Sequence, residues 1–527
     1  MWNVKCRIQS TGDFYYAKET SMQNPYWLLP REAYGSYQAY LEDTGENAVV
    51  KARSLTSELV LNEIRQSGLR GRGGAGFPTG TKWRTLQTHS CPTRFVVCNA
   101  AEGEPGTFKD RYLLRKNPYS TIEGMLIAAH VIGAQHLYIG LKTSFALEIQ
   151  RIKDALNEFW KMGLLEGLRF TIVEGPEEYL LGEEKALLNV IDGAGPLPRE
   201  AHYPPYELGL FAKPGSPNPA LVNNAETFAH VASIVRNGAA NFRAIGTADT
   251  PGTCIFTLCG DVSRPGVYER PAGITIRQLL YEVAGGPSQG RDFKVVLSGV
   301  ATGVIMPDKF DTPAEFGSLH MIGSGLGSAG FIAYCEGTSA PRIAQMVARF
   351  LYVESCNQCT ACKHGLRTAS TTLDKYFSME GAGEDDFDRA LAGAQHAPQA
   401  NRCYLPVQGS MLITSLMTRF RHEFDALQAG SAEARETVPI PKIKDFNEAI
   451  GAFEYDEFQE HKNPDWSYSV PRHPVPKPAA PAATSHGPVS IHLEPDVREA
   501  FLALARSGSV DLEKQVNDTL RQWLESR

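Results

Sequence analysis

The stretch Glu354-Ser-Cys356-Asn-Gln-Cys359-Thr-Ala-Cys362-Lys-His-Gly365, together with Cys403 farther along the chain, fixes the class of one domain. Three cysteines at successive two-residue gaps place three thiols on one short turn and helix. A fourth thiol from a distant loop completes a tetrahedral set, which is what a cubane iron–sulfur cluster requires. The stretch therefore predicts a [4Fe-4S] cluster bound by Cys356, Cys359, Cys362 and Cys403, in a protein that moves electrons.

Two other uses of these cysteines compete with the cluster. Structural zinc sites usually take their ligands from two separated pairs rather than from a triplet. Disulfide bonds belong to oxidising compartments, and nothing marks this chain as secreted. We rank zinc second and disulfide bonds third.

Working outward from the triplet, the flanking sequence predicts a helical domain over 338–430. Apolar residues recur at helical spacing over 343–351, just before the triplet. Further helices are expected near 387–391 and 411–426, with Cys403 on the loop between them. We therefore expect the cluster to be enclosed by a helical bundle.

Beyond 430 the composition changes twice. We interpret 431–488 as an extended segment that ends in a linker rich in proline and alanine. Residues 489–527 have the strand-helix-helix order of some DNA-binding modules. Their strand, 489–493, lacks the basic residues that such modules use to contact DNA bases, so we expect a docking or dimerisation module.

Upstream of the triplet, short buried strands alternate with amphipathic helices, which predicts a mainly parallel, doubly wound sheet. Ligands bind beyond the carboxyl ends of the strands in such sheets, and this rule places Asn99-Ala-Ala-Glu102-Gly-Glu104-Pro-Gly106 at the expected site. The expected strands and helices lie, in order, at 94–99, 120–129, 136–140, 144–162 and 169–173.

The remaining regions differ from this alternating pattern. Short β-rich pieces and turn clusters over 246–337, with a helix at 275–283, indicate a small separate α+β domain. Residues 1–56 are polar and aromatic without a clear period, so we expect an extension that wraps the surface. The full set of expected regions is 1–56 (extension), 57–245 (ligand-binding α/β domain), 246–337 (small α+β domain), 338–430 (helical domain), 431–488 (extended segment and linker) and 489–527 (appended module).

Length and composition narrow the class of protein. A chain of 527 residues is too long for one core, and 43% hydrophobic with 21% charged residues is ordinary for a globular protein. The net charge of -7 argues against nucleic-acid binding, which favours basic surfaces. The longest apolar stretch, near 125–134, is too short to span a bilayer, and the first residues lack a signal peptide's apolar core. We therefore expect a cytoplasmic protein without direct membrane insertion.

A glycine-rich run, Gly68-Leu-Arg-Gly71-Arg-Gly73-Gly-Ala-Gly76-Phe-Pro-Thr-Gly80, precedes the first strand. It satisfies G-x-G-x-x-G, but it follows a helix and no acidic residue follows at the distance that holds a ribose, so we reject the usual dinucleotide fingerprint. The backbone can still approach a flat or phosphorylated ligand closely. Arg72 and Lys82 can neutralise phosphate, and Phe77 offers an aromatic face. A glycine turn without a ligand is the alternative.

Three further polar groups are candidate site residues. Glu102 and Glu104 form a carboxylate pair suited to acid–base chemistry, although a solvated loop explains them as well. Glu183 and Glu184 form a second pair after Tyr179. The amides of Asn223 and Asn224 suit a phosphate or a ribityl chain.

The combination of these motifs resembles the NADH-binding 51-kDa-type flavoprotein subunit of respiratory complex I. This family includes the β-subunits of NAD-dependent formate dehydrogenases and the diaphorase subunits of NAD-reducing hydrogenases. The resemblance covers about 57–430, and its motifs are Gly68–Gly80 with Lys82-Trp83, Cys98–Gly106 with Phe108-Lys-Asp-Arg111, Tyr179 with Gly182-Glu-Glu184, Asn223-Asn224, and the cysteine stretch with Cys403.

The resemblance implies a multidomain α/β fold: a Rossmann-like FMN-binding domain, a small ubiquitin-like (SLBB) domain and a helical [4Fe-4S] bundle. It implies hydride exchange between NAD(H) and FMN and single-electron transfer to iron–sulfur clusters of a larger complex, formate-dehydrogenase-like or complex-I-like. Glu102 and Glu104 would face the nicotinamide nucleotide, and Phe77 would stack on it. The residues expected to bind FMN or nucleotide are Gly71, Arg72, Gly73, Gly74, Phe77, Lys82, Asn99, Glu102, Tyr179, Glu183, Glu184, Tyr206, Asn223 and Asn224.

Three positions depart from the family pattern near the ligand site. Ala101 replaces an aspartate, Thr85 replaces an aromatic residue, and Tyr203 stands where the family supplies a cation. Tyr206 can still stack, and Arg199 is a candidate for the lost charge. These departures motivate two alternatives: an internal electron relay that binds FMN and cluster but not NAD(H), and a non-catalytic scaffold with a docking or DNA-binding tail.

The expected partners follow from the same resemblance. Some fused relatives carry a thioredoxin-like [2Fe-2S] module, and 1–56, with Cys6 alone, cannot build one. We therefore expect a separate thioredoxin-like [2Fe-2S] subunit and a larger iron–sulfur or catalytic subunit as partners, and no nucleic acid.

Overall fold

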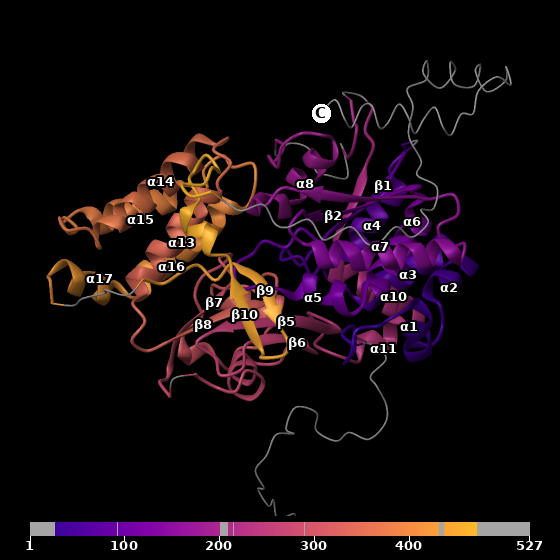
Figure 1. Ribbon diagram of the computed structural model, residues 1–527, viewed down its shortest axis with the longest axis horizontal. Coiled ribbons are helices and arrows are strands. Elements are labelled where there is room, and N and C mark those ends of the chain that lie inside the picture. Colours follow the sequence, from indigo (N-terminus) through magenta and orange to yellow (C-terminus); the bar gives the residue numbers. More distant parts are fainter. Residues whose placement is uncertain are drawn as a thin grey trace, which may run out of the picture. The chain divides into compact units, whose positions relative to one another are not determined.

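A computed structural model describes residues 27–91, 93–200, 209–213, 216–288, 290–431 and 437–471 (Figure 1). The expected appended module at 489–527, most of the expected linker and Tyr206 lie outside these residues. Among the described residues, no helix is both long and apolar enough to cross a membrane.

The first domain is built on a parallel four-stranded sheet with the order β3-β2-β1-β4. Its strands are β1 (Phe95–Asn99), β2 (His136–Lys142), β3 (Arg169–Gly175) and β4 (Ala220–Asn224). Successive residues of β1 face opposite sides of the sheet, so Val96 and Cys98 enter one core while Phe95 and Val97 enter another. The predicted doubly wound parallel sheet is confirmed.

Helices cover both faces of this sheet. On one face α6 and α10 pack side by side against β1, and α8 contributes Leu187 and Leu188 to the core on the other face. The helices of this domain are α3 (Ser57–Ser67), α4 (Thr79–Thr88), α5 (Lys109–Lys116), α6 (Pro118–Ile132), α7 (Ala146–Lys161), α8 (Glu184–Ile191), α10 (Ala225–Asn237) and α11 (Ala239–Arg243), with a short turn η1 (Tyr179–Gly182).

Strand order reverses beside β1, because the chain adds β2 and β3 on one side and β4 on the other. The ends of β1 and β4 are in register, with Asn99 opposite Asn224. Ligands of doubly wound sheets bind in the crevice at such a reversal. The fold therefore directs two asparagine-bearing strand ends into one crevice.

Part of the expected N-terminal extension belongs to this domain. Residues 37–54 form α1 (Tyr37–Thr44) and α2 (Ala48–Ser54) instead of a surface wrap. The hydroxyls of Tyr37 and Tyr40 donate to Glu123 on α6 over 2.7 and 2.8 Å, and Arg236 pairs with the same carboxylate. Polar aromatic residues are buried here because a distant ion pair satisfies their hydroxyls.

The second domain is a mixed four-stranded sheet with the order β6-β5-β8-β7. The central strands β5 (Thr253–Gly260) and β8 (Gly330–Cys335) run parallel, and the outer strands β6 (Gly266–Pro271) and β7 (Phe293–Ser298) pair antiparallel to them. Short helical pieces pack on it: η2 (Gln278–Val283), η3 (Pro307–Lys309) and α12 (Phe316–Met321). This is the predicted small α+β domain.

The third domain is the predicted helical bundle. It consists of α13 (Ala340–Glu354), α14 (Thr360–Lys375), α15 (Asp386–His396), α16 (Leu405–Arg419) and α17 (Arg421–Gln428). The helices α14 and α15 pack closely at Gly365 and Gly393, where a Cβ on Gly365 would lie 2.6 Å from the carbonyl oxygen of Gly393. Glycine permits this approach because it has no side chain.

The chain then returns across the other domains. Residues 437–471, which we call the strap, contain the antiparallel hairpin β9 (Ile443–Asn447) and β10 (Ala452–Tyr455) and the turn η4 (Glu457–His461). In Figure 1 the strap lies in orange and yellow between the sheet of the second domain and the helical bundle. We expected only an extended segment here, and the strap instead has regular structure with buried side chains.

Candidate functional site

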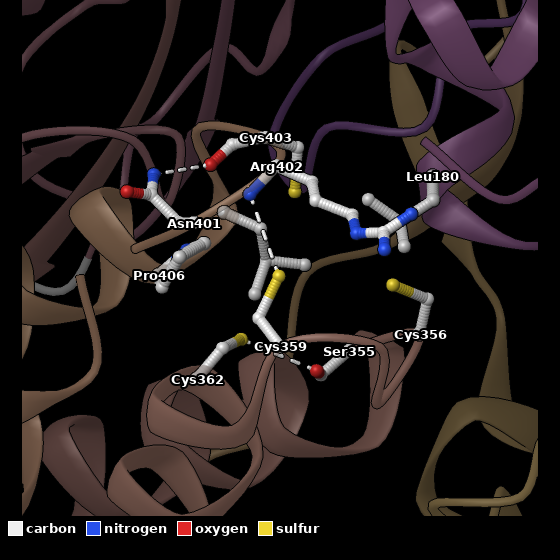
Figure 2. Close-up of a pocket in the computed structure, with 10 residues that line it drawn as sticks. Leu180, Ser355, Cys356, Cys359, Cys362, Asn401, Arg402, Cys403 and Pro406 are labelled. Atoms are coloured by element: carbon white, nitrogen blue, oxygen red, sulfur yellow. Dashed lines mark hydrogen bonds between the residues drawn. The ribbon is translucent and has the colours of Figure 1, made fainter. Parts of the chain in front are cut away.

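Cys356 and Cys359 lie in the turn between α13 and α14, Cys362 lies in the first turn of α14, and Cys403 lies just before α16. Asn357 turns the chain between Cys356 and Cys359 with a φ of 60°, a left-handed conformation that asparagine tolerates better than most residues. Figure 2 shows the four cysteines around one pocket. The other residues that line it are Leu180, Ser355, Asn401, Arg402, Leu405 and Pro406.

Hydrogen bonds reach three of these sulfurs. The backbone N–H of Arg402 donates to Cys359 Sγ over 3.4 Å, and Gln358 Nε2 donates to Cys356 Sγ over 3.4 Å. The hydroxyl of Ser355 lies 3.3 Å from Cys362 Sγ. Such hydrogen bonds are among the factors that set the reduction potential of an iron–sulfur cluster.

The chemistry of the thiols fits a metal cluster. Burial raises the pKa of Cys362 to about 11, and burial also raises the pKa of Cys403. Positive iron would favour the thiolate forms of these two buried side chains by compensating their charge. The donor set is therefore suited to a ligand that supplies that charge.

The spacing favours a cluster over a single zinc ion. Across the described part of the chain, no three His, Cys, Asp or Glu side chains converge closely enough to hold one metal ion. One zinc ion with bonds of about 2.3 Å would draw its thiolates to roughly 3.8 Å from one another. A cubane cluster does not need three thiols to meet at one metal position, because each thiol binds a different iron.

The second part of the site lies at the ends of β1 and β4, where the strand order reverses and where the family resemblance places FMN; we call this region the flavin crevice. The glycine-rich loop lies over the end of β4, because a Cβ on Gly73 would be 3.1 Å from Asn224 Cβ. The N–H of Gly71 donates to the carbonyl of Phe77 over 2.9 Å and closes the loop. Gly74 has a φ of 119°, which only glycine adopts readily.

Ion pairs and amides gather around this crevice. Lys82 Nζ lies 2.8 Å from Glu184 Oε1 and donates to the carbonyl of Val222 at the end of β4. Asn99 Nδ2 donates to the carbonyl of Gly182 over 2.8 Å. The structure thus brings together the predicted residues Gly71, Gly73, Gly74, Lys82, Asn99, Glu183, Glu184, Asn223 and Asn224.

A buried lysine that we had given no role orients one of these amides. Lys109 Nζ lies 2.7 Å from Asp110, 2.8 Å from Glu226 and 3.2 Å from Asn224 Oδ1. Burial would raise the pKa of Glu226, but the charge of Lys109 dominates and lowers it to about 2. On the other amide, Trp83 Nε1 donates to Asn223 Oδ1 over 3.0 Å. Both asparagines are therefore held in fixed orientations.

Phe77 stands out at the rim of the glycine loop because half of it is exposed, at 51%. A large exposed aromatic residue beside a crevice suits stacking on a planar ligand.

Glu183 caps the start of α8. Its side chain accepts the N–H of Ala186 over 2.9 Å, and burial raises the pKa of its carboxyl to about 7.

Two predicted residues make other contacts than expected. Arg72 is buried and donates to the carbonyls of Pro251 and Thr253, so its guanidinium faces the second domain rather than a phosphate. Glu102 is also buried and pairs with Arg111 over 3.1 Å. It accepts a backbone N–H at the start of α5 as well. Both contacts favour a structural role over the predicted ligand contacts.

Glu104 and Tyr179 connect the three domains. The hydroxyl of Tyr179 donates to Glu104 Oε2 over 2.5 Å and lies 3.0 Å from Gln408 Nε2 on α16. Glu104 Oε1 accepts the N–H of Val300 in the second domain over 2.6 Å. Burial raises the pKa of Glu104, while the hydrogen bonds from Tyr179 and Val300 oppose that shift. Gln408 carries no motif, and nothing in the sequence indicates it.

One short segment contacts both parts of the site. In η1, Leu180 lines the cysteine pocket, while the carbonyl of Gly182 accepts Asn99 of the flavin crevice. The backbone N–H of Tyr179 donates to Glu354, the residue two before Cys356. The flavin crevice and the cysteine pocket are therefore neighbours across a single turn of chain.

Comparison with known families agrees with this arrangement. Residues 64–233 match the Nuo51 FMN-binding domain, 255–307 match the SLBB domain, and 342–427 match the NADH-ubiquinone oxidoreductase-F iron-sulfur binding region. The chain thus carries the regions that this family uses for FMN and for a 4Fe-4S cluster.

Relatives match along most of their length. An F-type subunit of NADH-quinone oxidoreductase in Rhizobium meliloti (strain 1021) is 37% identical over 408 residues, covering 76% of this chain and 94% of that protein. The HndC subunit of the NADP-reducing hydrogenase of Solidesulfovibrio fructosivorans is 32% identical, covering 74% and 80%. A crystal structure of NAD+-reducing [NiFe]-hydrogenase in the air-oxidized state superposes with a TM-score of 0.67 at 30% identity, covering 77% and 68%. The chain accordingly belongs to the family of F-type NADH-quinone oxidoreductase subunits, the flavoprotein oxidoreductase subunits that its motifs resemble.

Proposed function

We propose that this protein exchanges a hydride between NAD(H) and FMN and passes single electrons through a [4Fe-4S] cluster to other redox subunits of a larger complex. The observation that carries the proposal is the segment Tyr179–Gly182, which contacts both the flavin crevice and the cysteine pocket. Bound FMN would exchange electrons in pairs with a nicotinamide and singly with a cluster.

In this scheme the residues of the chain bind FMN and the nicotinamide nucleotide and orient them. Asn99 and Asn224 supply amides at the strand ends, and Lys82 supplies a positive charge beside them. Phe77 supplies the aromatic face for the nicotinamide. Glu104 is held in place by the hydroxyl of Tyr179 and the N–H of Val300, so its carboxyl has a fixed orientation beside the nucleotide. Preorganised donors of this kind align reactants without rearrangement during the reaction.

Electrons would leave the flavin through the cysteine pocket. Cys356, Cys359, Cys362 and Cys403 would hold the cluster, and Leu180 would separate it from the flavin side. The two enzymes to which the relatives belong by name, a quinone oxidoreductase and a hydrogenase, are multisubunit redox complexes. We therefore propose other redox subunits as partners, including a thioredoxin-like [2Fe-2S] subunit, and a cytoplasmic location in which the thiols stay reduced.

An anaerobic titration of the purified protein with NADH tests the proposal. FMN accepts two electrons and one cluster accepts a third, so we expect about 1.5 equivalents of NADH to bleach the flavin absorbance and to lower the cluster absorbance in the same sample. If dithionite bleaches the flavin while NADH does not, the protein is an internal relay. Ala101, which is buried among apolar side chains, is one of the three departures from the family pattern that would explain that result, together with Thr85 and Tyr203.

A further inference from the structure

The strap connects the flavin side of the molecule to the cysteine motif. Its first half packs on α5, the helix that follows the Glu102–Gly106 loop. Phe446 and Phe453 stack near Phe108, and the carbonyl of Pro441 accepts the N–H of Gly106 over 2.8 Å. Arg111, the partner of Glu102, donates to the carbonyls of residues 443 and 444 over 3.0 and 3.1 Å. The strap is thus fixed to the loop that borders the flavin crevice.

Its second half ends on Glu354, at the end of α13. Lys462 Nζ lies 2.9 Å from both carboxylate oxygens of Glu354, and both side chains are fully buried at 0% exposure. Gln459 Nε2 donates to the same carboxylate over 2.9 Å. Lys442 in turn donates to Gln459 Oε1 over 2.8 Å. A buried charge without its partner is strongly unfavourable, so this end of the strap is held firmly.

Glu354 has a second role at this point. Its Oε2 accepts the backbone N–H of Tyr179 over 3.1 Å, so one carboxylate binds the strap and the segment η1 together. The neighbouring residue of that segment, Leu180, lines the cysteine pocket. The position of η1 against the pocket therefore depends on a carboxylate that Lys462 neutralises.

The strap also contacts the cysteine turn directly. Asn357, the left-handed residue between Cys356 and Cys359, donates from Nδ2 to the carbonyl of Pro464 over 3.0 Å. Arg349 on α13 donates to the carbonyl of Glu460 over 2.6 Å. The conformation of the triplet turn is thus supported from the strap as well as from its own helices.

We propose that the strap is a clamp that sets the alignment of the flavin crevice with the cysteine pocket, and that Lys462 is a positioning residue for electron transfer from flavin to cluster. The electron-transfer part rests on the proposed function. In this role Lys462 touches neither cofactor and acts through Glu354, which orders both η1 and the start of the cysteine stretch.

The test uses the full chain loaded with FMN and cluster, and the variant Lys462→Met. A light flash with a sacrificial amine donor reduces the flavin without NADH, and the cluster is followed by its absorbance and its spin-resonance signal. Hydrogen exchange of peptides that cover 179–182 and the strap is the second readout. Lys444→Met, on the exposed side of the same strap, is the matched control.

We expect Lys462→Met to slow the flavin-to-cluster step roughly tenfold or more and to speed amide exchange at 179–182, with flavin reduction by the flash unchanged. The double variant Glu354→Gln with Lys462→Met carries no unpaired buried charge. It should therefore recover most of the flavin-to-cluster rate and most of the protection from amide exchange at 179–182. If Lys462→Met does not fold, Gln459→Leu is the milder variant, with the same expected direction.

Two results would overturn the clamp. One is faster exchange at 179–182 with an unchanged rate of cluster reduction, which would make the strap a structural anchor only. The other is amide exchange at 179–182 that stays unchanged in both Lys462→Met and Gln459→Leu. A wild-type protein whose photoreduced flavin never reduces the cluster would instead contradict the proposed function, and this outcome is visible before any variant is compared.

Discussion

The flavin crevice and the cysteine pocket are built in opposite ways. The crevice is assembled from five places in the chain, and it exists because a parallel sheet brings Asn99 and Asn224 to the same edge. The pocket takes three of its four thiols from one seven-residue stretch and needs only Cys403 from elsewhere. A site built by topology depends on the whole domain, whereas a site built by a local motif depends on a turn. Loss of the ligand of one site should therefore leave the other site able to bind its own, although the segment Tyr179–Gly182 borders both.

The largest expected effect breaks the pocket and leaves the crevice intact. Cys403→Ala removes the one thiol that comes from a distant loop, so we expect bound iron to fall at least roughly tenfold while bound FMN stays near its normal amount. Iron and flavin analysis of the purified variant measures both. Cys91→Ser, a half-buried cysteine outside both sites, serves as the control. Equal loss of flavin and iron would show that the sites are not independent.

The next effect breaks the crevice and leaves the pocket intact. In Gly73→Val the added side chain meets Asn224 Cβ at about the 3.1 Å found for a Cβ alone. Overpacking typically costs about 1–3 kcal/mol, so FMN affinity should weaken roughly tenfold to hundredfold with the iron content unchanged. Fluorescence titration of the flavin-free protein with FMN gives the affinity. Gly35→Val, where no atom lies within 4 Å, should bind FMN normally.

The smallest expected effect concerns Lys142, at the sheet edge beside the flavin crevice, and its contribution to the free energy of unfolding. Lys142 ends β2 next to Gly103, and burial together with the positive charge of Lys442 lowers the pKa of its ammonium to about 7. Between pH 7 and about 10.4 the unfolded chain binds one more proton than the folded protein, so this lysine destabilises the fold most below pH 7 and progressively less above it.

Lys142→Met should therefore raise the free energy of unfolding by roughly 1–4 kcal/mol near pH 7, with a gain that shrinks as the pH approaches 10. Thermal unfolding as a function of pH measures the trend. Lys161→Met, an exposed lysine on α7, is the matched variant and should show no such slope. A gain that is the same at every pH would mean that packing, and not the charge, sets the effect.

The features that depend on short-range pattern could be predicted from the sequence. The triplet spacing identified the pocket, and the alternation of strands and helices placed Asn99 at the carboxyl end of a strand. Asn224 was assigned to the same site through its amide chemistry and the family resemblance. The burial of Tyr37 and Tyr40 could not be predicted, because Glu123 and Arg236, which satisfy their hydroxyls, lie about 80 to 200 positions away.

The same limit explains the two residues whose contacts differ from the prediction. Arg72 lies in a glycine-rich loop and has the charge that a phosphate needs, but its partners are backbone carbonyls of the second domain. Glu102 lies beside a candidate catalytic carboxylate, yet the Arg111 that engages it is itself held by the strap. The partners of Arg72 come from another domain. The partner of Glu102 lies in the same motif, but its orientation is set by the strap, which local pattern does not connect to that motif.

The shared segment Tyr179–Gly182 has a consequence for how this chain can be divided. Family boundaries at 233 and 342 suggest separable parts, and an engineer might exchange the cluster region of one relative for that of another. Such a cut would leave Tyr179 without Gln408 and Glu354, and Leu180 without the pocket it lines. A unit that keeps the contacts between the two sites is therefore larger than either region. It includes Tyr179–Gly182, its partners Gln408 and Glu354, and the strap.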